Sequence, residues 1–273
     1  MSGQGVALVT GASSGIGAES AKHLAAAGFL VYAAARRTDR LGELASGSIR
    51  PLTMDVTDDD SVTAGVQQVL AEAGRIDALV NNAGYGSYGA VEDVPLDEAR
   101  RQFEVNLFGL ARLTQLVIPG LRQQGSGRIV NISSMGGRFA MPFGAWYHAT
   151  KFAVEGFSDA LRQELAPFGI QVVVIEPGGI KTEWGGISAA SALERSGEGP
   201  YAARVQRIAR ALAGSDRRFG SEPGVVAKAI TTAVTARRPR TRYAIGAGAK
   251  PAIYARRFLP DRVMDALIGR VLG

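Results

Sequence analysis

The first thirty residues constrain the fold more than any other part of the chain. Val6–Thr10 is a short apolar run with the length and composition of a buried parallel strand. It leads into Gly11-Ala-Ser-Ser-Gly15-Ile-Gly17 and then into a helical stretch over residues 18–27. Such a turn suits a phosphate group, because free N–H groups and the helix dipole face the anion and no side chain blocks it. We therefore predict a dinucleotide site. A structural turn is the alternative, since the spacing G-x-x-x-G-x-G departs from G-x-G-x-x-G.

The rest of the chain repeats this alternation of strand and helix. Five more apolar runs of strand length, separated by helical stretches, occupy residues 29–35, 49–54, 76–80, 128–134 and 170–175. Six strands alternating with helices predict an α/β fold with a doubly wound parallel sheet, the Rossmann arrangement. Ligands of such sheets lie outside the carboxyl ends of the strands. The residues that follow each run are therefore the candidates for a binding site.

At 273 residues, of which 46% are hydrophobic and 21% charged, the chain fits one globular domain with ample core. Within it we expect a cofactor and catalytic core, a substrate lid made of a flexible glycine-containing stretch and a helix, and a C-terminal helical extension, at residues 1–182, 183–222 and 223–273. The chain has no cysteine, which excludes disulfides and thiolate metal sites. No metal site is predicted.

The net charge of +6 is concentrated near the C-terminus, where residues 191–273 hold 16 Lys/Arg and 6 Asp/Glu. The charges alternate with apolar residues at helical spacing, which favours a solvated surface over a site for anionic ligands or membrane headgroups. No nucleic-acid recognition motif accompanies them, so nucleic acid is not an expected partner. No signal peptide or membrane-spanning run is visible, and we expect a cytoplasmic protein.

The end of the second predicted strand indicates which dinucleotide is bound. Where NAD-binding folds place an acidic residue for the ribose 2′-hydroxyl, this chain has Ala35, followed by Arg36 and Arg37. An arginine there suits a 2′-phosphate, because its planar fork pairs with phosphate oxygens. We predict NADP(H) in preference to NAD(H), with Arg36 ahead of Arg37. Ordinary loop charges are the alternative.

Polar and small residues follow the later strands. Asp55 can bond the adenine amino group or equally cap the helix that begins near residues 57–60. The small residues of Asn81-Asn-Ala-Gly84 would keep the carboxyl edge of the sheet open. Asn106 falls in the middle of a helical stretch over residues 95–120, where asparagine is a poor residue. A helix distortion that aims it into the site would explain it, although its position alone favours no role.

Tyr147 and Lys151 stand four residues apart, on one face of a predicted helix. There the ammonium group can stabilise the phenolate and lower the tyrosine pKa, which makes a proton donor for carbonyl chemistry. Ser134 ends the fifth strand 13 residues earlier and can converge on the same point. Ser133 should point to the opposite face of that strand. His148 is expected to be structural.

Together these residues resemble the short-chain dehydrogenase/reductase family, in its single-domain Tyr-x-x-x-Lys form, over roughly residues 5–185. The resemblance is carried by Thr10-Gly-Ala-Ser-Ser-Gly-Ile-Gly17, Asp55, Asn81-Asn-Ala-Gly84, Asn106, Ser134, Tyr147, Lys151 and Pro177-Gly178. It implies that Tyr147 is the general acid/base and that Lys151 lowers its pKa and binds the nicotinamide ribose. Ser134 would hold the substrate oxygen, and Asn106 would anchor a proton-relay water.

The resemblance also implies which residues contact the cofactor. These are Gly11, Ser13, Ser14, Gly15, Ile16, Gly17, Arg36, Arg37, Asp55, Val56, Asn82, Ala83, Gly84, Tyr147, Lys151, Pro177, Gly178, Ile180 and Thr182. The expected activity is NADP(H)-dependent hydride transfer between the nicotinamide and a small hydrophobic carbonyl compound or secondary alcohol. A catalytically idle NADP(H)-binding regulatory or scaffold protein is the alternative. A homodimer or homotetramer is expected.

The substrate side is expected to be apolar or aromatic. Met141 and Phe143 precede the catalytic helix, and Trp184 follows the last predicted strand, so these three should line the pocket with Ser134 and Tyr147. Residues 251–273 alternate basic and large apolar residues. Docking of this stretch onto the domain or onto a sister subunit is the favoured interpretation, and an interfacial membrane helix is the alternative.

Overall fold

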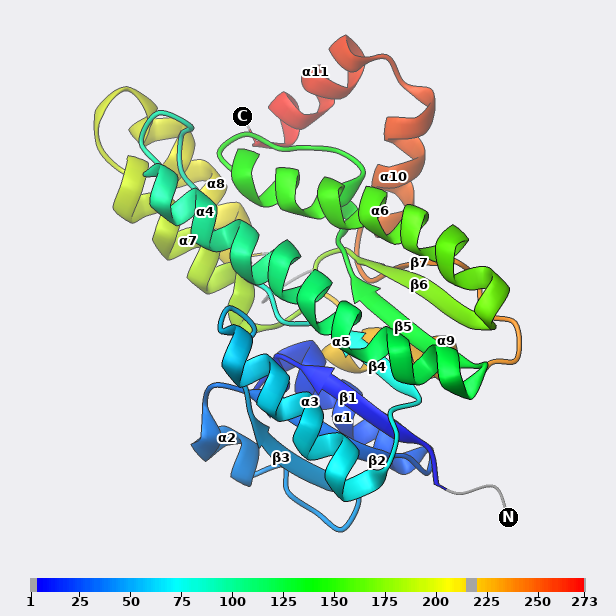
Figure 1. Ribbon diagram of the computed structural model, residues 1–273. Coiled ribbons are helices and arrows are strands. Elements are labelled where there is room, and N and C mark those ends of the chain that lie inside the picture. Colours follow the sequence, from blue (N-terminus) through cyan, green and yellow to red (C-terminus); the bar gives the residue numbers. More distant parts are fainter. Residues whose placement is uncertain (1–3, 215–219, 273) are drawn as a thin grey trace.

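The computed structural model describes residues 4–214 and 220–272 and contains a seven-stranded, fully parallel sheet (Figure 1). The strand order is β3-β2-β1-β4-β5-β6-β7. The bounds are β1 Val6–Thr10, β2 Leu30–Ala35, β3 Ile49–Thr53, β4 Ala78–Asn81, β5 Gly127–Ile132, β6 Ile170–Pro177 and β7 Arg242–Ile245. The doubly wound fold predicted from the alternation of apolar runs and helical stretches is therefore confirmed.

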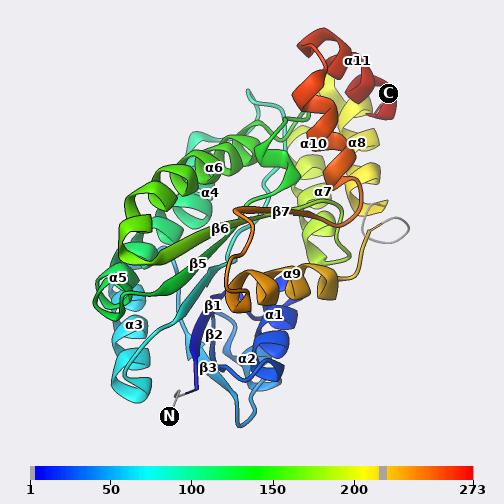
Figure 2. The same cartoon turned by 90° about the vertical axis from the view of Figure 1, so that its right-hand side faces the viewer.

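Helices cover both faces of the sheet (Figure 2). One face carries α1 (Gly15–Ala26), α2 (Thr38–Gly42) and α9 (Pro223–Thr235), and the other carries α3 (Asp59–Ala73), α5 (Gly109–Gln124) and α6 (Ala145–Leu165). The strands alternate accordingly. Ala7 and Val9 of β1 pack toward α1 and α9, whereas Val6 and Leu8 pack toward α3 and α5. Each face thus has its own apolar core.

The predicted long helix over residues 95–120 is interrupted. It consists of α4 (Leu96–Phe103), a π-helical turn η1 (Glu104–Phe108) and α5. Asn106 lies in the π turn. A distortion of the helix at this asparagine, one of the two alternatives left open by the sequence, is what the structure contains.

The expected lid begins with a helix rather than a flexible stretch. α7 (Glu183–Ser196) starts where Thr182 accepts a hydrogen bond from the Trp184 N–H. After a short 3-10 turn, η4 (Gly199–Tyr201), α8 (Ala202–Gly214) packs against α7. The small residues read as flexible instead let α7 pack closely, since Ser188, Ala189 and Ala192 are buried. Residues 215–219 of the expected lid lie outside the described residues.

The C-terminal extension is not wholly helical, which corrects the prediction. β7 adds a seventh strand beside β6 before α10 (Ala249–Phe258) and α11 (Asp261–Leu272) complete the chain. At four residues, Arg-Tyr-Ala-Ile, it is too short for an apolar run to stand out. Three short turns, η2 (Met135–Gly137), η3 (Ala166–Phe168) and η4, connect other elements. Among the described residues, no helix is long and apolar enough to cross a bilayer.

The two halves of the sheet meet between β1 and β4, where the strand order reverses. The buried Thr10 hydroxyl accepts hydrogen bonds from the N–H groups of Asn82 (3.0 Å) and Ala83 (3.1 Å). In return, the Asn82 amide donates to the carbonyl oxygens of Thr10 (2.9 Å) and Gly11 (3.2 Å). The glycine-rich turn after β1 and the turn after β4 are thereby held in one position relative to each other.

Thr10→Val should therefore destabilise the protein. The substitution keeps the shape of the side chain but leaves the Ala83 N–H without its acceptor and the Asn82 N–H with only the Val80 carbonyl oxygen, at 3.1 Å. The loss of an acceptor for a buried N–H group typically costs about 1–3 kcal/mol in the free energy of unfolding. Chemical denaturation measures the loss. Thr10→Ser retains the hydroxyl and is the matched control, expected to lie closer to wild type; equal stability of the Val and Ser variants would contradict the role given to the hydroxyl.

Candidate active site

A single cavity of about 890 Å³ runs along the carboxyl ends of the strands. Its lining includes nearly all of the residues predicted for the site: Gly11, Ser13, Ser14, Gly15, Ile16, Arg36, Arg37, Asp55, Val56, Asn82, Ala83, Gly84, Ser134, Met141, Tyr147, Lys151, Pro177, Gly178, Ile180, Thr182 and Trp184. Three predicted residues, Gly17, Asn106 and Phe143, are not part of the lining. Catalytic, nucleotide-side and apolar residues therefore share one continuous space.

The glycine-rich turn leaves no room for side chains on its inner side. A Cβ atom on Gly17 would lie 2.3 Å from the Gly11 carbonyl oxygen, so Gly17 packs against the turn instead of facing the cavity. At the start of α1, the side chain of the N-cap residue Ser14 accepts no hydrogen bond from the N–H groups of the helix, and the first turn contains no acidic residue. The N-terminal N–H groups of α1 are thus left to an anion, and the turn fits the phosphates of a dinucleotide.

The two arginines after β2 take different positions. Arg37 donates to the hydroxyls of Ser13 (3.0 Å) and Ser14 (3.1 Å), which places its guanidinium over the glycine-rich turn. Arg36 lies beside Asp55, with 3.8 Å between Nη1 and Oδ2. Both side chains are exposed at the mouth of the cavity. Two cations thus flank the position beyond β2 where a ribose 2′ substituent would lie.

Asp55 does not cap α3, which excludes one of its two suggested roles. Asp58 is the N-cap residue and accepts from the Ser61 N–H. Asp55 instead accepts from the backbone N–H and the hydroxyl of Thr57 and lines the cavity. A contact with adenine remains a prediction.

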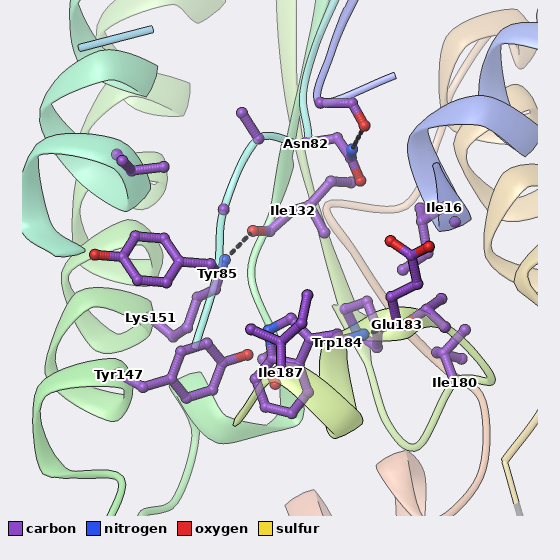
Figure 3. Close-up of a pocket in the computed structure, with 18 of the residues that line it drawn as sticks. Ile16, Asn82, Tyr85, Ile132, Tyr147, Lys151, Ile180, Glu183, Trp184 and Ile187 are labelled. Carbon is purple, nitrogen blue, oxygen red and sulfur yellow. Dashed lines mark hydrogen bonds between the residues drawn. The ribbon is translucent and has the colours of Figure 1, made fainter. Parts of the chain in front are cut away.

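Tyr147 and Lys151 project from α6 into the cavity, as Figure 3 shows. The Lys151 ammonium lies 6.0 Å from the Tyr147 ring centroid and donates to the Ile132 carbonyl oxygen at 2.8 Å. Tyr147 shares a side-chain hydrogen bond with Ser134, and Ser134 Oγ accepts from the Gly136 N–H at 3.0 Å. A phenol, an alcohol and an ammonium group thus converge at the end of β5.

Burial governs the protonation of this pair. It raises the pKa of Tyr147 to about 12, an effect that the hydrogen bond with Ser134 partly offsets. It lowers the pKa of Lys151 to about 8, against the opposing effect of the Glu155 carboxylate. The tyrosine pKa therefore departs in the direction opposite to that expected from the lysine, because desolvation of the phenolate outweighs an ammonium group 6.0 Å from the ring centroid. Tyr147 keeps its proton at neutral pH.

Asn106 supports the site from behind. Its Oδ1 accepts from the Tyr85 N–H at 3.0 Å, and its Nδ2 donates to the Tyr85 carbonyl and to the Thr150 hydroxyl, both at 3.0 Å. The π turn thus aims a buried asparagine at the turn after β4 and at α6 together. The role of Asn106 in anchoring a relay water stays a prediction.

Aromatic rings form the wall opposite Lys151. The centroid of Trp184 lies 5.1 Å from that of Tyr147 and 6.0 Å from that of Tyr88. Gly86 makes room for the indole, since a Cβ atom there would lie 2.5 Å from Trp184. Phe143 was expected to line the cavity, but it is not among the lining residues. Its backbone takes a φ of 65°, and its ring is buried beside this wall, with its centroid 5.8 Å from that of Tyr201.

Sequence reasoning missed much of the apolar end of the cavity. Ile187 of α7 and Ile208, Ala211 and Leu212 of α8 line it. The spacing of the apolar residues in α8 indicates an inner face, but it does not say which cavity that face meets.

His148 was expected to be structural, and its ring holds the loop after β5 in place. Its Nε2 accepts a hydrogen bond from the Met141 N–H at 3.0 Å, and its Nδ1 lies 2.9 Å from the Gly136 carbonyl oxygen.

A buried charge cluster behind Lys151 also escaped sequence reasoning. Glu155, one helical turn after Lys151, and Glu176 of β6 share two arginines. Arg242 Nε lies 3.0 Å from a Glu155 carboxylate oxygen and 3.6 Å from one of Glu176, and Arg138 lies 3.5 and 3.6 Å from the same groups. Burial, with the nearby Glu155 charge, raises the pKa of Glu176 to about 7. β7, which supplies Arg242, thus reaches the back of the site.

A parallel sheet with a glycine-rich turn after β1 and a Tyr-x-x-x-Lys pair beside a serine defines a nucleotide-linked oxidoreductase. The family model described as short chain dehydrogenase matches residues 5–191, and the chain belongs to the short-chain dehydrogenase/reductase family. The chain is similar to 3-ketodihydrosphingosine reductase of Bacteroides thetaiotaomicron, 36% identical over 95% of each chain. NADPH-dependent 3-dehydrocapnine reductase of Ornithobacterium rhinotracheale is 34% identical, over 96% of this chain and 95% of that protein. The crystal structure of a short-chain dehydrogenase from Streptomyces avermitilis superposes with a TM-score of 0.83 at 36% identity, covering 97% and 96% of the two chains.

Glu176→Gln should change the pH dependence of stability. The folded state binds the Glu176 proton more tightly than the unfolded state does, since the pKa is about 7 against an ordinary value of 4.5. Its contribution to the free energy of unfolding therefore falls as the pH rises between these two values. Glutamine does not titrate, so the variant lacks this loss. Between pH 4.5 and 7, the free energy of unfolding of the variant should therefore rise relative to that of wild type by about 1 kcal/mol or more.

Chemical denaturation at a series of pH values measures the difference. Glu164→Gln alters an exposed carboxylate of the same helix as Glu155 and should run parallel to wild type. Parallel curves for Glu176→Gln and wild type would contradict the raised pKa.

Proposed function

We propose that this protein is an NADPH-dependent reductase of hydrophobic ketones, with Tyr147 as the proton donor. The observation that carries the proposal is the convergence of Tyr147, Ser134 and Lys151 where the nucleotide side of the cavity meets its apolar end. Reduction needs a protonated donor, and the raised pKa of Tyr147 keeps it protonated at neutral pH.

The residues present fit a dinucleotide. The glycine-rich turn and the N-terminus of α1 would hold the pyrophosphate. Arg36 and Arg37 would hold the 2′-phosphate, and Lys151 would hold the nicotinamide ribose. When bound, the nicotinamide supplies the hydride for the carbonyl carbon. The name of the Ornithobacterium relative, which states NADPH dependence, supports this choice of cofactor.

The protein's own residues would handle the oxygen of the carbonyl group. Ser134 and Tyr147 donate hydrogen bonds to it, and the Tyr147 proton moves to the oxygen as the C–O bond takes up charge. The Lys151 ammonium group then stabilises the phenolate until it is reprotonated. Trp184 and Tyr88 would confine the ketone against Tyr147.

The apolar end of the cavity supports a hydrophobic substrate. Ile187, Ile208 and Leu212 line it, and Ile187 is exposed at its rim. Two relatives are named as reductases, one of 3-ketodihydrosphingosine and one of 3-dehydrocapnine. A ketone with an alkyl chain fits both observations.

Tyr147→Phe should abolish ketone reduction and leave NADPH binding largely intact. The variant removes the proton donor and nothing else, and the loss expected for a positioned acid is about 10²–10⁴-fold in kcat. Oxidation of NADPH with a panel of hydrophobic ketones measures turnover, and titration calorimetry measures binding. Tyr201→Phe removes a hydroxyl outside the cavity lining and should retain activity. Near wild-type turnover in Tyr147→Phe would refute the mechanism, and binding of NADPH without turnover of any ketone by wild type would favour an idle binding protein.

Arg36→Asp should shift the cofactor preference toward NADH. A carboxylate repels the 2′-phosphate and accepts from a ribose hydroxyl, so the ratio of the two dissociation constants should change by about tenfold or more. Arg37→Asp is the matched comparison, because that guanidinium also holds Ser13 and Ser14. An unchanged ratio in Arg36→Asp would refute the assignment of Arg36. A shift found only in Arg37→Asp would assign the 2′-phosphate to Arg37 instead.

A further inference from the structure

The last two helices present an apolar surface that the rest of the chain leaves uncovered. Tyr254 and Phe258 are 58% and 74% exposed and lie one turn apart on α10. Val263 and Leu267 are 44% and 40% exposed and lie one turn apart on α11. In each helix a spacing of four residues places the pair on one face. Met264 is buried, so α11 docks by one side only and keeps a second apolar side free.

The same region is strongly basic. Together α8, α10 and α11 carry eight basic residues against two acidic ones: Arg204, Arg207, Arg210, Lys250, Arg256, Arg257, Arg262 and Arg270 against Asp261 and Asp265. α8 itself contains no acidic residue. Arginines around exposed aromatic and aliphatic side chains are the composition of a helix that lies in a lipid headgroup layer.

This surface adjoins the apolar end of the cavity. α11 contacts α8, whose Ile208, Ala211 and Leu212 line the cavity, and α10 contacts the η2 turn that follows Ser134. Figure 2 shows α10 and α11 at the same end of the molecule as α7 and α8. Ala211 is exposed on α8, so the cavity reaches the protein surface next to the basic helices.

We propose that α8, α10 and α11 form a docking face for anionic membrane surfaces, through which a long-chain ketone reaches the cavity. Arginines pair with lipid phosphates, and Tyr254, Phe258, Val263 and Leu267 enter the boundary between headgroups and acyl chains. A second copy of the chain fits this face less well. A two-fold interface brings the same patch from both subunits together, and here that would place two sets of arginines opposite each other. The delivery of substrate rests on the proposed function, whereas the docking itself does not.

Vesicle flotation tests the docking without reference to turnover. Wild type should bind vesicles made of equal parts phosphatidylcholine and phosphatidylglycerol, should not bind vesicles of phosphatidylcholine alone, and should be released by salt. The double variant Arg257→Glu/Arg262→Glu should weaken binding by about tenfold or more. The matched control Lys228→Glu/Arg237→Glu reverses two exposed charges on α9 and just after it, gives the same net charge, and should bind as wild type. Equal loss in both double variants, or no binding of wild type at low salt, would overturn the proposal.

The apolar side chains need their own test. Phe258→Ser should weaken binding to the same anionic vesicles, whereas Phe168→Ser, at an exposed phenylalanine in η3, should not. Analytical ultracentrifugation without lipid checks the rival occupant, since an oligomer that dissociates in Phe258→Ser would assign the face to a second copy and overturn the proposal.

Turnover separates the docking from the proposed function. For a long-chain ketone carried in anionic vesicles, kcat/KM should fall in Arg257→Glu/Arg262→Glu by about the factor lost in binding. For a short water-soluble ketone, which needs no membrane, the same variant should match wild type. Reduction of soluble ketones without vesicle binding would refute the docking and support the proposed reductase function. Vesicle binding without reduction of any ketone would support the docking and refute the reductase function.

Discussion

The hydrogen bonds between the ends of β1 and β4 are the constraint on which the site depends. Thr10 and Asn82, which are 72 residues apart in the chain, join two turns. The glycine-rich turn lies on one side of this junction, and the turn that contains Tyr85 lies on the other. Asn106 accepts a hydrogen bond from the Tyr85 N–H and donates one to the hydroxyl of Thr150, which precedes Lys151 on α6. These hydrogen bonds, together with the short backbone segment from Ala83 to Tyr85, therefore set the distance between the glycine-rich turn and α6.

Desolvation sets the protonation of Tyr147 and Lys151. Tyr147 and Lys151 are buried by the packing that positions them, and burial shifts each toward its uncharged form. For the tyrosine this suits a group that gives a proton away. For the lysine it is countered by Glu155, whose charge is in turn balanced by Arg138 and Arg242. The positive charge beside the phenol is thus maintained from outside the cavity.

Sequence alone predicted the elements that have their own local signal. The first six strands, the glycine-rich turn and the residues around Tyr147 all follow from apolar runs, glycine spacing and helical periodicity. What it could not supply depends on tertiary contacts. β7 is a strand because β6 offers it an edge, and Phe143 is buried beside the cavity instead of lining it, at a position where the loop takes a positive φ. The small residues of α7 read as a flexible stretch, yet they allow helix packing against α8. The cluster of Glu155, Glu176 and two arginines joins four separate segments, so no spacing in the chain reveals it.

The position of β7 has a consequence for how the protein is made. Arg242 is one of two arginines that balance the buried carboxylates next to Lys151, and it lies on β7, which follows β1 to β6 in the chain. During synthesis from the N-terminus, β1 to β6 and the whole nucleotide side emerge before it does. A nascent chain at that stage contains Glu155 and Glu176 but only one of their two arginine partners, Arg138. Burial of unpaired charge is costly. Closure of the half that contains Tyr147 and Lys151 is therefore expected only after β7 has been synthesised, whereas the half that contains the glycine-rich turn is free to fold earlier.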